Sequence, residues 1–98
     1  MRNLNSIPLS ALRTVEAIAR TGTLARAADE LGVTPGALSQ RLNKEELALG
    51  RTLFIRTPAG LQPNEACTAI LPRLSRAIED LSAVVADISA GSTNVLTV

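Results

Sequence analysis

Apolar residues recur at the spacing of one helix face in four segments of the chain. The second segment, LARAADEL at 24–31, places its apolar residues at i, i+3, i+4 and i+7, which is the stripe of an amphipathic helix. Glycine, a common residue just past a helix C-terminus, follows the first three segments at Gly22, Gly32 and Gly50. The pattern predicts helices at about residues 9–21, 24–31, 34–49 and 65–90.

Between the third and fourth helices the pattern changes to that of two short strands. Residues 53–55 are an apolar run, Pro-Ala-Gly at 58–60 predicts a turn, and Leu61 follows it. Residues 53–63 are therefore predicted to form a short β-hairpin. Near the end of the chain, VLTV at 95–98 has the composition of a strand and follows a Gly-Ser-Thr linker at 91–93.

The break between the second and third helices has signals of its own. Gly32 allows a tight turn, Thr34 is a favoured N-cap, and Pro35 suits the first helical turn because it lacks an N–H. Two short helices joined by such a turn form a helix-turn-helix, predicted here at residues 23–42. The third helix would then project from a compact base, as a recognition helix does when it enters the DNA major groove.

The outward face of this third helix carries side chains suited to DNA. Residues 34–44 contain no acid, and their glutamine, arginine and serine side chains can bond bases or phosphates. The alternative interpretation is a helical hairpin that serves only as core. The hairpin after the helix favours DNA, because its strands and Arg56 would make a wing. The candidate DNA-binding residues are Thr23, Arg26, Thr34, Pro35, Gly36, Ser39, Gln40, Arg41, Lys44, Arg56 and Thr57.

The fourth helix carries a heptad pattern. Its apolar residues follow a 4, 3, 4, 3, 4 spacing, which favours packing against a partner helix and so a homodimer. The alternative is a helix that packs only on its own domain. Pro72 lies inside the segment and is expected to kink the helix without ending it. The candidate dimerisation residues are Ile70, Leu74, Ala77, Leu81, Val84 and Ile88.

Charge is unevenly distributed along the chain, although the net charge is only +1. Residues 1–56 hold eight basic and five acidic side chains and are +3, whereas residues 57–98 are −2. A polyanion would prefer the first part. An ordinary surface distribution of charge is the alternative.

The residue types that the chain lacks exclude several kinds of site. The chain has no His and one Cys, Cys67, so we expect neither an internal disulfide nor an ordinary zinc site. Ser39 and Cys67 have no His to activate them, so we expect no enzyme activity, no metal and no other cofactor. No apolar run reaches the ~20 residues that span a bilayer, and no signal-peptide core is present. We therefore expect a cytoplasmic protein without membrane contact.

Four motifs in this order resemble the N-terminal DNA-binding domain of LysR-type transcriptional regulators, over residues 9–90. They are LRTVEAIARTGTL at 12–24, AADELGVTPGALSQRL at 27–42, LGRTLFIRT at 49–57 and NEA at 64–66. The resemblance implies a mainly α fold. This fold is a winged helix-turn-helix with a three-helix core and a short β-hairpin wing, followed by a long C-terminal linker helix that dimerises.

The resemblance also implies an organisation in three parts. Residues 1–63 would be the DNA-binding domain with its wing at 53–63, residues 64–90 the dimerisation helix, and residues 91–98 a linker and the start of an effector domain absent from this chain. The implied partners are double-stranded DNA, bound at a partly palindromic site with helix 34–49 in the major groove, and a second copy of the chain. A full-length protein would have the further option of a tetramer and would bind a small-molecule effector only through its C-terminal domain. The alternative is a protein–protein interaction module without nucleic-acid binding.

Two positions depart from the family pattern. The family usually has Gln-Pro where this chain has Pro35-Gly36, so base reading should lean more on Thr34, Ser39 and Gln40. The family has Leu-Glu where this chain has Glu45-Glu46, which puts Glu45 on the apolar face of the third helix. We expect one of two outcomes, because an unpaired buried carboxylate costs several kcal/mol. Glu45 pairs with Arg20, Arg51 or Arg56, or the end of the helix rotates so that Leu47 packs instead.

Overall fold

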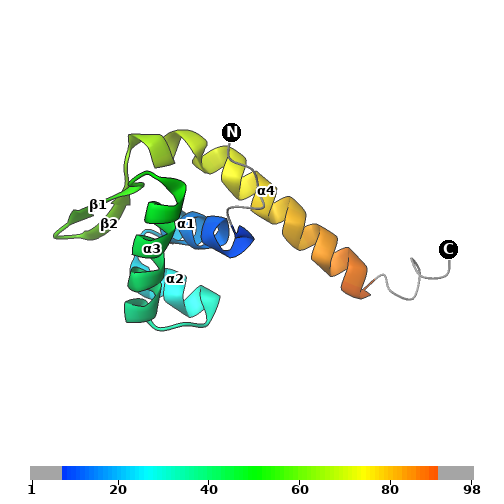
Figure 1. Cartoon of the computed structure of the whole chain (residues 1–98). Helices are drawn as coiled ribbons and strands as arrows, with labels where there is room; N and C mark the ends of the chain where they lie inside the picture. The colour runs from blue at the N-terminus through cyan, green and yellow to red at the C-terminus, as the bar shows by residue number, and fades with distance from the viewer. Residues whose placement is uncertain (1–7, 91–98) are drawn as a thin grey trace.

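The computed structural model describes residues 8–90. Three short helices, a two-stranded hairpin and a long last helix follow one another, which confirms the predicted order of elements. Figure 1 shows the short helices gathered together, with the hairpin beside α3 and with α4 running away from them. The predicted linker at 91–93 and strand at 95–98 lie outside the described residues. The elements are α1 (Leu9–Thr21), α2 (Leu24–Leu31), α3 (Pro35–Leu49), β1 (Phe54–Thr57), β2 (Gly60–Pro63) and α4 (Glu65–Ala90).

Local signals place the helix-turn-helix where the sequence predicts it. The Thr23 hydroxyl accepts the Arg26 N–H at 3.0 Å and so caps α2. Gly32 ends α2 with a φ of 72°, a left-handed conformation that favours glycine. The Thr34 hydroxyl then accepts the Ala37 N–H at 3.2 Å, and Pro35 is the first residue of α3.

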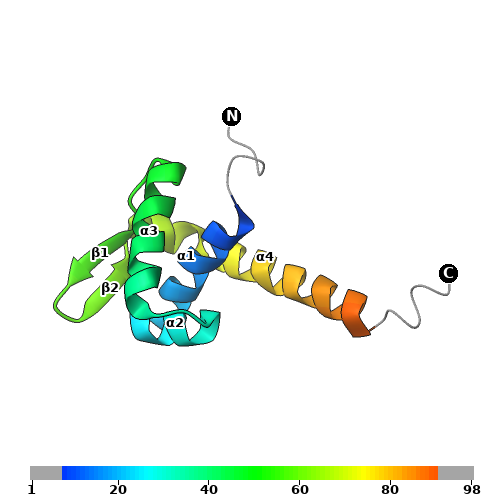
Figure 2. The ribbon, with the colours of Figure 1, turned by 60° about the horizontal axis from the view of Figure 1, so that its bottom comes forward.

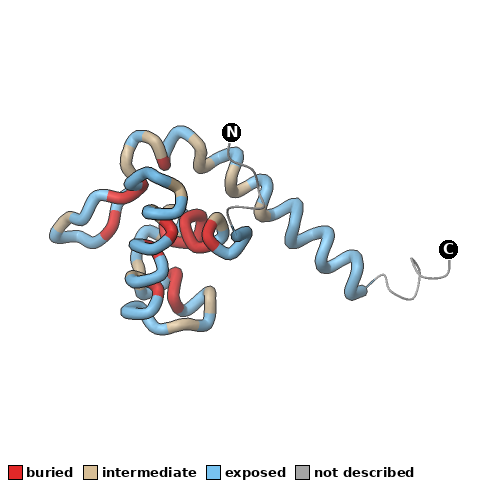
Figure 3. The backbone as a smooth tube through the Cα atoms, viewed as in Figure 1, coloured by how far each residue is buried: buried red, intermediate tan, exposed pale blue. Residues whose placement is uncertain are grey.

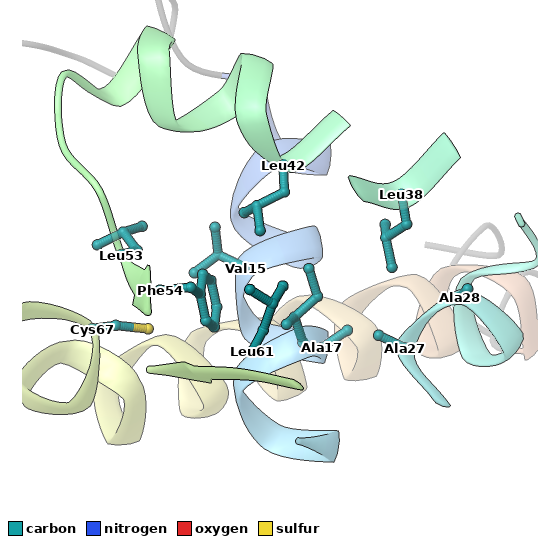
Figure 4. Packing of buried hydrophobic residues seen from close by; sticks show 11 residues of the cluster. Val15, Ala17, Ala27, Ala28, Leu38, Leu42, Leu53, Phe54, Leu61 and Cys67 are labelled. Carbon is teal, nitrogen blue, oxygen red and sulfur yellow. The ribbon is translucent and has the colours of Figure 1, made fainter. Parts of the chain in front are cut away.

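The core lies where α1 meets α2, α3 and the base of the hairpin. Ile18 of α1 is fully buried, and Leu38 and Leu42 of α3 are 0% and 1% exposed. Figure 4 shows side chains of α3, the hairpin and the start of α4 converging on Val15 and Ala17 of α1. This packing leaves the opposite side of α3 to the solvent, as Figure 3 shows.

The hairpin and α4 continue directly from this core. The two strands pair antiparallel from Phe54 opposite Pro63 to Thr57 opposite Gly60, so the paired hairpin begins one residue later than the predicted 53. The Asn64 side chain accepts a hydrogen bond from the Cys67 N–H at 2.9 Å and so caps α4. The helix continues through Pro72 to Ala90, so this proline does not end it.

Candidate nucleic-acid interface

The outward face of α3 is polar and cationic. Leu38 and Leu42 point into the core, so the residues between them and before them face the solvent. Ser39 is half-buried, whereas Pro35, Gly36, Gln40, Arg41 and Lys44 are exposed. Figure 2 shows this helix on the surface of the molecule, beside the hairpin. The structure therefore brings six of the predicted DNA-binding residues to one exposed helix.

Two threonines predicted to bind DNA are helix caps. The Thr23 and Thr34 hydroxyl oxygens accept the N–H groups of Arg26 and Ala37. A hydroxyl that accepts one hydrogen bond still has its proton to donate, so capping leaves both side chains able to bond a phosphate oxygen. Both threonines are exposed, and so is Arg26 on α2.

The hairpin brings Arg56 to the recognition helix. Arg56 Nη2 donates to Ser39 Oγ at 3.4 Å, although the two residues lie 17 positions apart in the sequence. The ion pairs of residues 8–90 all involve Arg20, so Arg56 has no carboxylate partner in this part of the chain. The Arg56 charge is therefore exposed to solvent beside α3.

Thr57 is engaged in the turn of the hairpin. Its hydroxyl donates to the Gly60 carbonyl at 3.0 Å and accepts the Ala59 N–H at 3.2 Å. A phosphate needs a hydrogen-bond donor, and the Thr57 proton is already used. The predicted DNA contact of Thr57 would require the turn to give up this bond.

Sequence reasoning did not find the role of Glu46. Its Oε2 atom accepts the N–H of Leu53 at 2.6 Å and that of Phe54 at 3.3 Å. These bonds tie the C-terminal part of α3 to the first residues of the wing. Asn64 adds to this junction, because its Nδ2 donates to the Thr52 carbonyl at 2.6 Å. A carboxylate just before the loop of residues 50–53 was the available signal for this role.

Both expectations for Glu45 are wrong. Glu45 stays buried with 8% of its surface exposed while Leu47 is 82% exposed, so the end of α3 does not rotate. Arg20 pairs with Glu16 and Glu30 instead, and within residues 8–90 no basic residue forms an ion pair with Glu45. The Glu45 Oε1 atom is buried without a hydrogen-bond partner. Rotation would also pull Leu42, which shares this face, out of the core.

Burial favours the neutral form of the Glu45 carboxyl. Burial raises its pKa to about 7, and the Arg41 charge, which favours the ionised form, offsets only part of this effect. Thr14 Oγ1 donates its proton to the Ser10 carbonyl at 2.9 Å, so toward Glu45 this oxygen can act only as an acceptor. A protonated Glu45 carries the proton that such an acceptor requires.

The predicted dimerisation residues divide into two groups along α4. Leu74 packs against the core of its own domain, and Ile70 is half-buried. Farther along, Leu81, Val84 and Ile88 are 44%, 52% and 64% exposed. Ala77 between the two groups is exposed as well. The first part of the heptad pattern thus serves the domain, and the second part faces solvent.

A polar network that the sequence did not indicate joins three helices. Glu16 of α1 is 4% exposed, and its Oε2 atom accepts hydrogen bonds from Arg20 Nε and from Ser75 Oγ of α4, both at 2.8 Å. Arg20 also forms an ion pair with Glu30 of α2. The Glu30 carboxyl has a lowered pKa because Arg20 bonds its ionised form.

The described residues hold no cluster of His, Cys, Asp and Glu that could bind a metal ion. Cys67 is a free, fully buried thiol at the start of α4. Its burial raises the pKa of the thiol, and the charge of Glu46 adds to this effect. Within residues 8–90, no helix has the length and apolar character that crossing a membrane requires.

Helices α1 to α3 with the hairpin define a winged helix-turn-helix domain, in which the second helix of the motif is exposed next to the wing. The family described as "Bacterial regulatory helix-turn-helix protein, lysR family" matches residues 9–68. The chain therefore belongs to the LysR family, which confirms the resemblance found in its motifs.

Individual proteins show the same relationship. The chain is 41% identical to the HTH-type transcriptional activator AmpR of Providencia stuartii over 85 residues, which cover 87% of this chain and 29% of AmpR. It is 44% identical over 73 residues to a carbapenem-hydrolyzing beta-lactamase transcriptional activator of Serratia marcescens, covering 74% of this chain and 25% of that protein. The chain thus spans less than a third of the length of these relatives.

A solved structure matches the fold over almost the whole described chain. The crystal structure of the CbnR DBD–DNA complex aligns with a TM-score of 0.69 and 26% identity, over 90% of this chain and 100% of that one.

Proposed function

We propose that this chain is the sequence-specific DNA-binding domain of a transcription regulator that acts in the cytoplasm. The observation that carries the proposal is the acid-free outward face of α3, which adjoins the exposed Arg56 of the wing. Gln40, at the middle of this face, bonds a base edge, and Ser39 and Arg41 bond phosphates or bases. Arg56 lies beside the duplex and neutralises a phosphate or enters the minor groove.

The domain binds a partly palindromic site as a homodimer. Leu81, Val84 and Ile88 leave an apolar strip on the free part of α4, and an isolated helix of this kind would be better covered by a second copy. A groove lined by Leu9, Ile78, Leu81 and Val85 continues this strip toward α1. In a full-length regulator, a C-terminal domain would add tetramer formation and binding of a small-molecule effector.

An interaction module without nucleic-acid binding is the less favoured alternative. Such a module would present large apolar side chains on the exposed face of its helical hairpin. Residues 34–44 present polar and cationic side chains there instead, and their large apolar members, Leu38 and Leu42, are buried. The relatives that match the chain are also transcription regulators by name.

The test is selection of bound sequences from a random pool of DNA duplexes, followed by binding measurements on the selected site. Gln40→Ala should weaken binding to that site by about 1–3 kcal/mol and leave binding to random DNA nearly unchanged. Thr68→Ala, on an exposed position of α4, is the matched control and should alter neither. Equal losses of affinity on both kinds of DNA would mean that Gln40 contacts the DNA backbone and not a base. A pool in which no sequence is enriched would refute the proposal.

A further inference from the structure

Glu16 of α1 holds α4 against the three-helix core. Its buried Oε2 atom accepts the Ser75 hydroxyl at 2.8 Å, across 59 positions of sequence. Arg20 donates to the same oxygen, and its ion pair with Glu30 fixes the guanidinium in turn. The Glu16 carboxylate of α1 thus bonds α4 directly through Ser75 and α2 indirectly through Arg20. Ser75 and Arg20 together fix its position.

Ser75 is also close to the point where α4 leaves the domain. Leu74 packs on the core beside it, whereas every residue from Glu79 to Ala90 is exposed. Figure 3 shows this change from partly buried to exposed along the helix. The free part of α4 therefore behaves as a lever whose direction is set near Ser75.

A small change in the angle between α4 and the three-helix core, made near Ser75, displaces the C-terminal end of α4 by several ångströms. From Ser75 to Ile88 the helix rises by about 20 Å, at 1.5 Å per residue. A change of about 10° moves the far end by about 3.5 Å relative to the three-helix core. That displacement equals one base-pair step of about 3.4 Å along DNA.

We propose that the Ser75–Glu16 hydrogen bond determines which spacing of half-sites the dimer accepts. The inference rests on the proposed function, because it requires two copies joined through α4 and each holding DNA. Ser75 and Glu16 are positioning residues and need not touch DNA themselves. A hydrogen bond is suited to this task because its energy falls steeply when the geometry is lost, whereas the apolar contact of Leu74 tolerates small rotations.

The experiment measures affinity for duplexes obtained by selection with the wild-type chain. Three duplexes are compared, in which the spacer between the two half-sites has the selected length, one base pair more or one base pair fewer. Ser75→Ala removes the donor, and Ser75→Thr and Ser75→Val form a pair of nearly equal shape that differ in the hydroxyl. Thr68→Ala, at an exposed position of the same helix outside the proposed dimer surface, is the control.

The wild type, Ser75→Thr and Thr68→Ala should all prefer the selected spacer. In Ser75→Ala and Ser75→Val this preference should fall by about fivefold, the factor that one ordinary hydrogen bond provides. An unchanged spacing preference in both Ser75→Ala and Ser75→Val would overturn the inference while leaving the proposed function intact. A wild type that binds no selected DNA would overturn the proposed function, and the inference with it.

Discussion

Replacing Glu45 with glutamine should stabilise the domain at pH 8 much more than at pH 5. The carboxyl lies on the core side of α3, and its Oε1 atom is buried without a hydrogen-bond partner. Glutamine keeps the shape of the side chain, carries no charge and can donate an N–H where the neutral carboxyl would donate its proton. The substitution therefore imitates the protonated state at every pH.

The size and sign of the effect follow from the pKa of Glu45. Burial raises this pKa from 4.5 to about 7 in the folded protein. As pH rises from 4.5 to 7, the unfolded chain loses its proton while the folded chain keeps it, so the wild type loses stability relative to Glu45→Gln. The difference is about 3 kcal/mol when fully developed, at 1.36 kcal/mol per pKa unit, and it is constant above pH 8. Rearrangement around the ionised carboxyl would make it smaller.

The assay is urea unfolding at a series of pH values from 5 to 8, at one fixed protein concentration. Circular dichroism is the suitable probe, because the chain has no Trp or Tyr for fluorescence. Leu47→Ala is the control on the same helix turn, and its effect should stay within about 0.5 kcal/mol because Leu47 is 82% exposed. The quantity compared is the free energy of unfolding of each variant minus that of the wild type.

Two results would refute the reasoning. A difference between Glu45→Gln and wild type that does not depend on pH would mean that the carboxyl does not titrate in this range. A wild type that becomes more stable than Glu45→Gln as pH rises would mean that the ionised carboxyl has a cationic partner, with Arg41 as the candidate because its charge lowers this pKa.

Three further predictions concern the wing, its attachment and the linker helix. Arg56→Ala should weaken binding to all DNA sequences and lower the slope of log affinity against log salt by about one unit, whereas an unchanged slope would remove Arg56 from the interface. Glu46→Ala should cost about 2 kcal/mol in urea unfolding, because two N–H groups of the wing lose a charged acceptor; no loss would mean that water replaces it. Leu81→Asp should shift the sedimentation of the chain at high micromolar concentration from dimer to monomer, and a monomeric wild type would contradict dimerisation through α4.

The helices were predictable because their signals lie within a few residues of each other. Thr23 and Thr34 each cap a helix by bonding an N–H three positions away, and Gly32 supplies the left-handed turn between α2 and α3. These interactions are local, so the sequence order alone specifies them. The same holds for the side of α3 that carries Leu38 and Leu42, which follows from the helical repeat.

The state of Glu45 depended on the tertiary structure. Its place on the apolar face could be predicted, but whether it found a basic partner depended on where Arg20 lies in space. Arg20 is held by Glu16 and Glu30, so the carboxyl remains without an ionic partner within residues 8–90. Which carboxylates pair with Arg20 cannot be predicted from the spacing of residues in the sequence.

The sequence by itself determined which residues form the helices, the turn and the outward face of α3. Only the tertiary structure decided which side chains meet across distant segments: Arg56 with Ser39, Glu46 with the first residues of the wing, and Ser75 with Glu16. The physical reason is the range of the interactions. Helix periodicity and capping act over three to seven residues, whereas these polar contacts exist only after the core has brought their elements together.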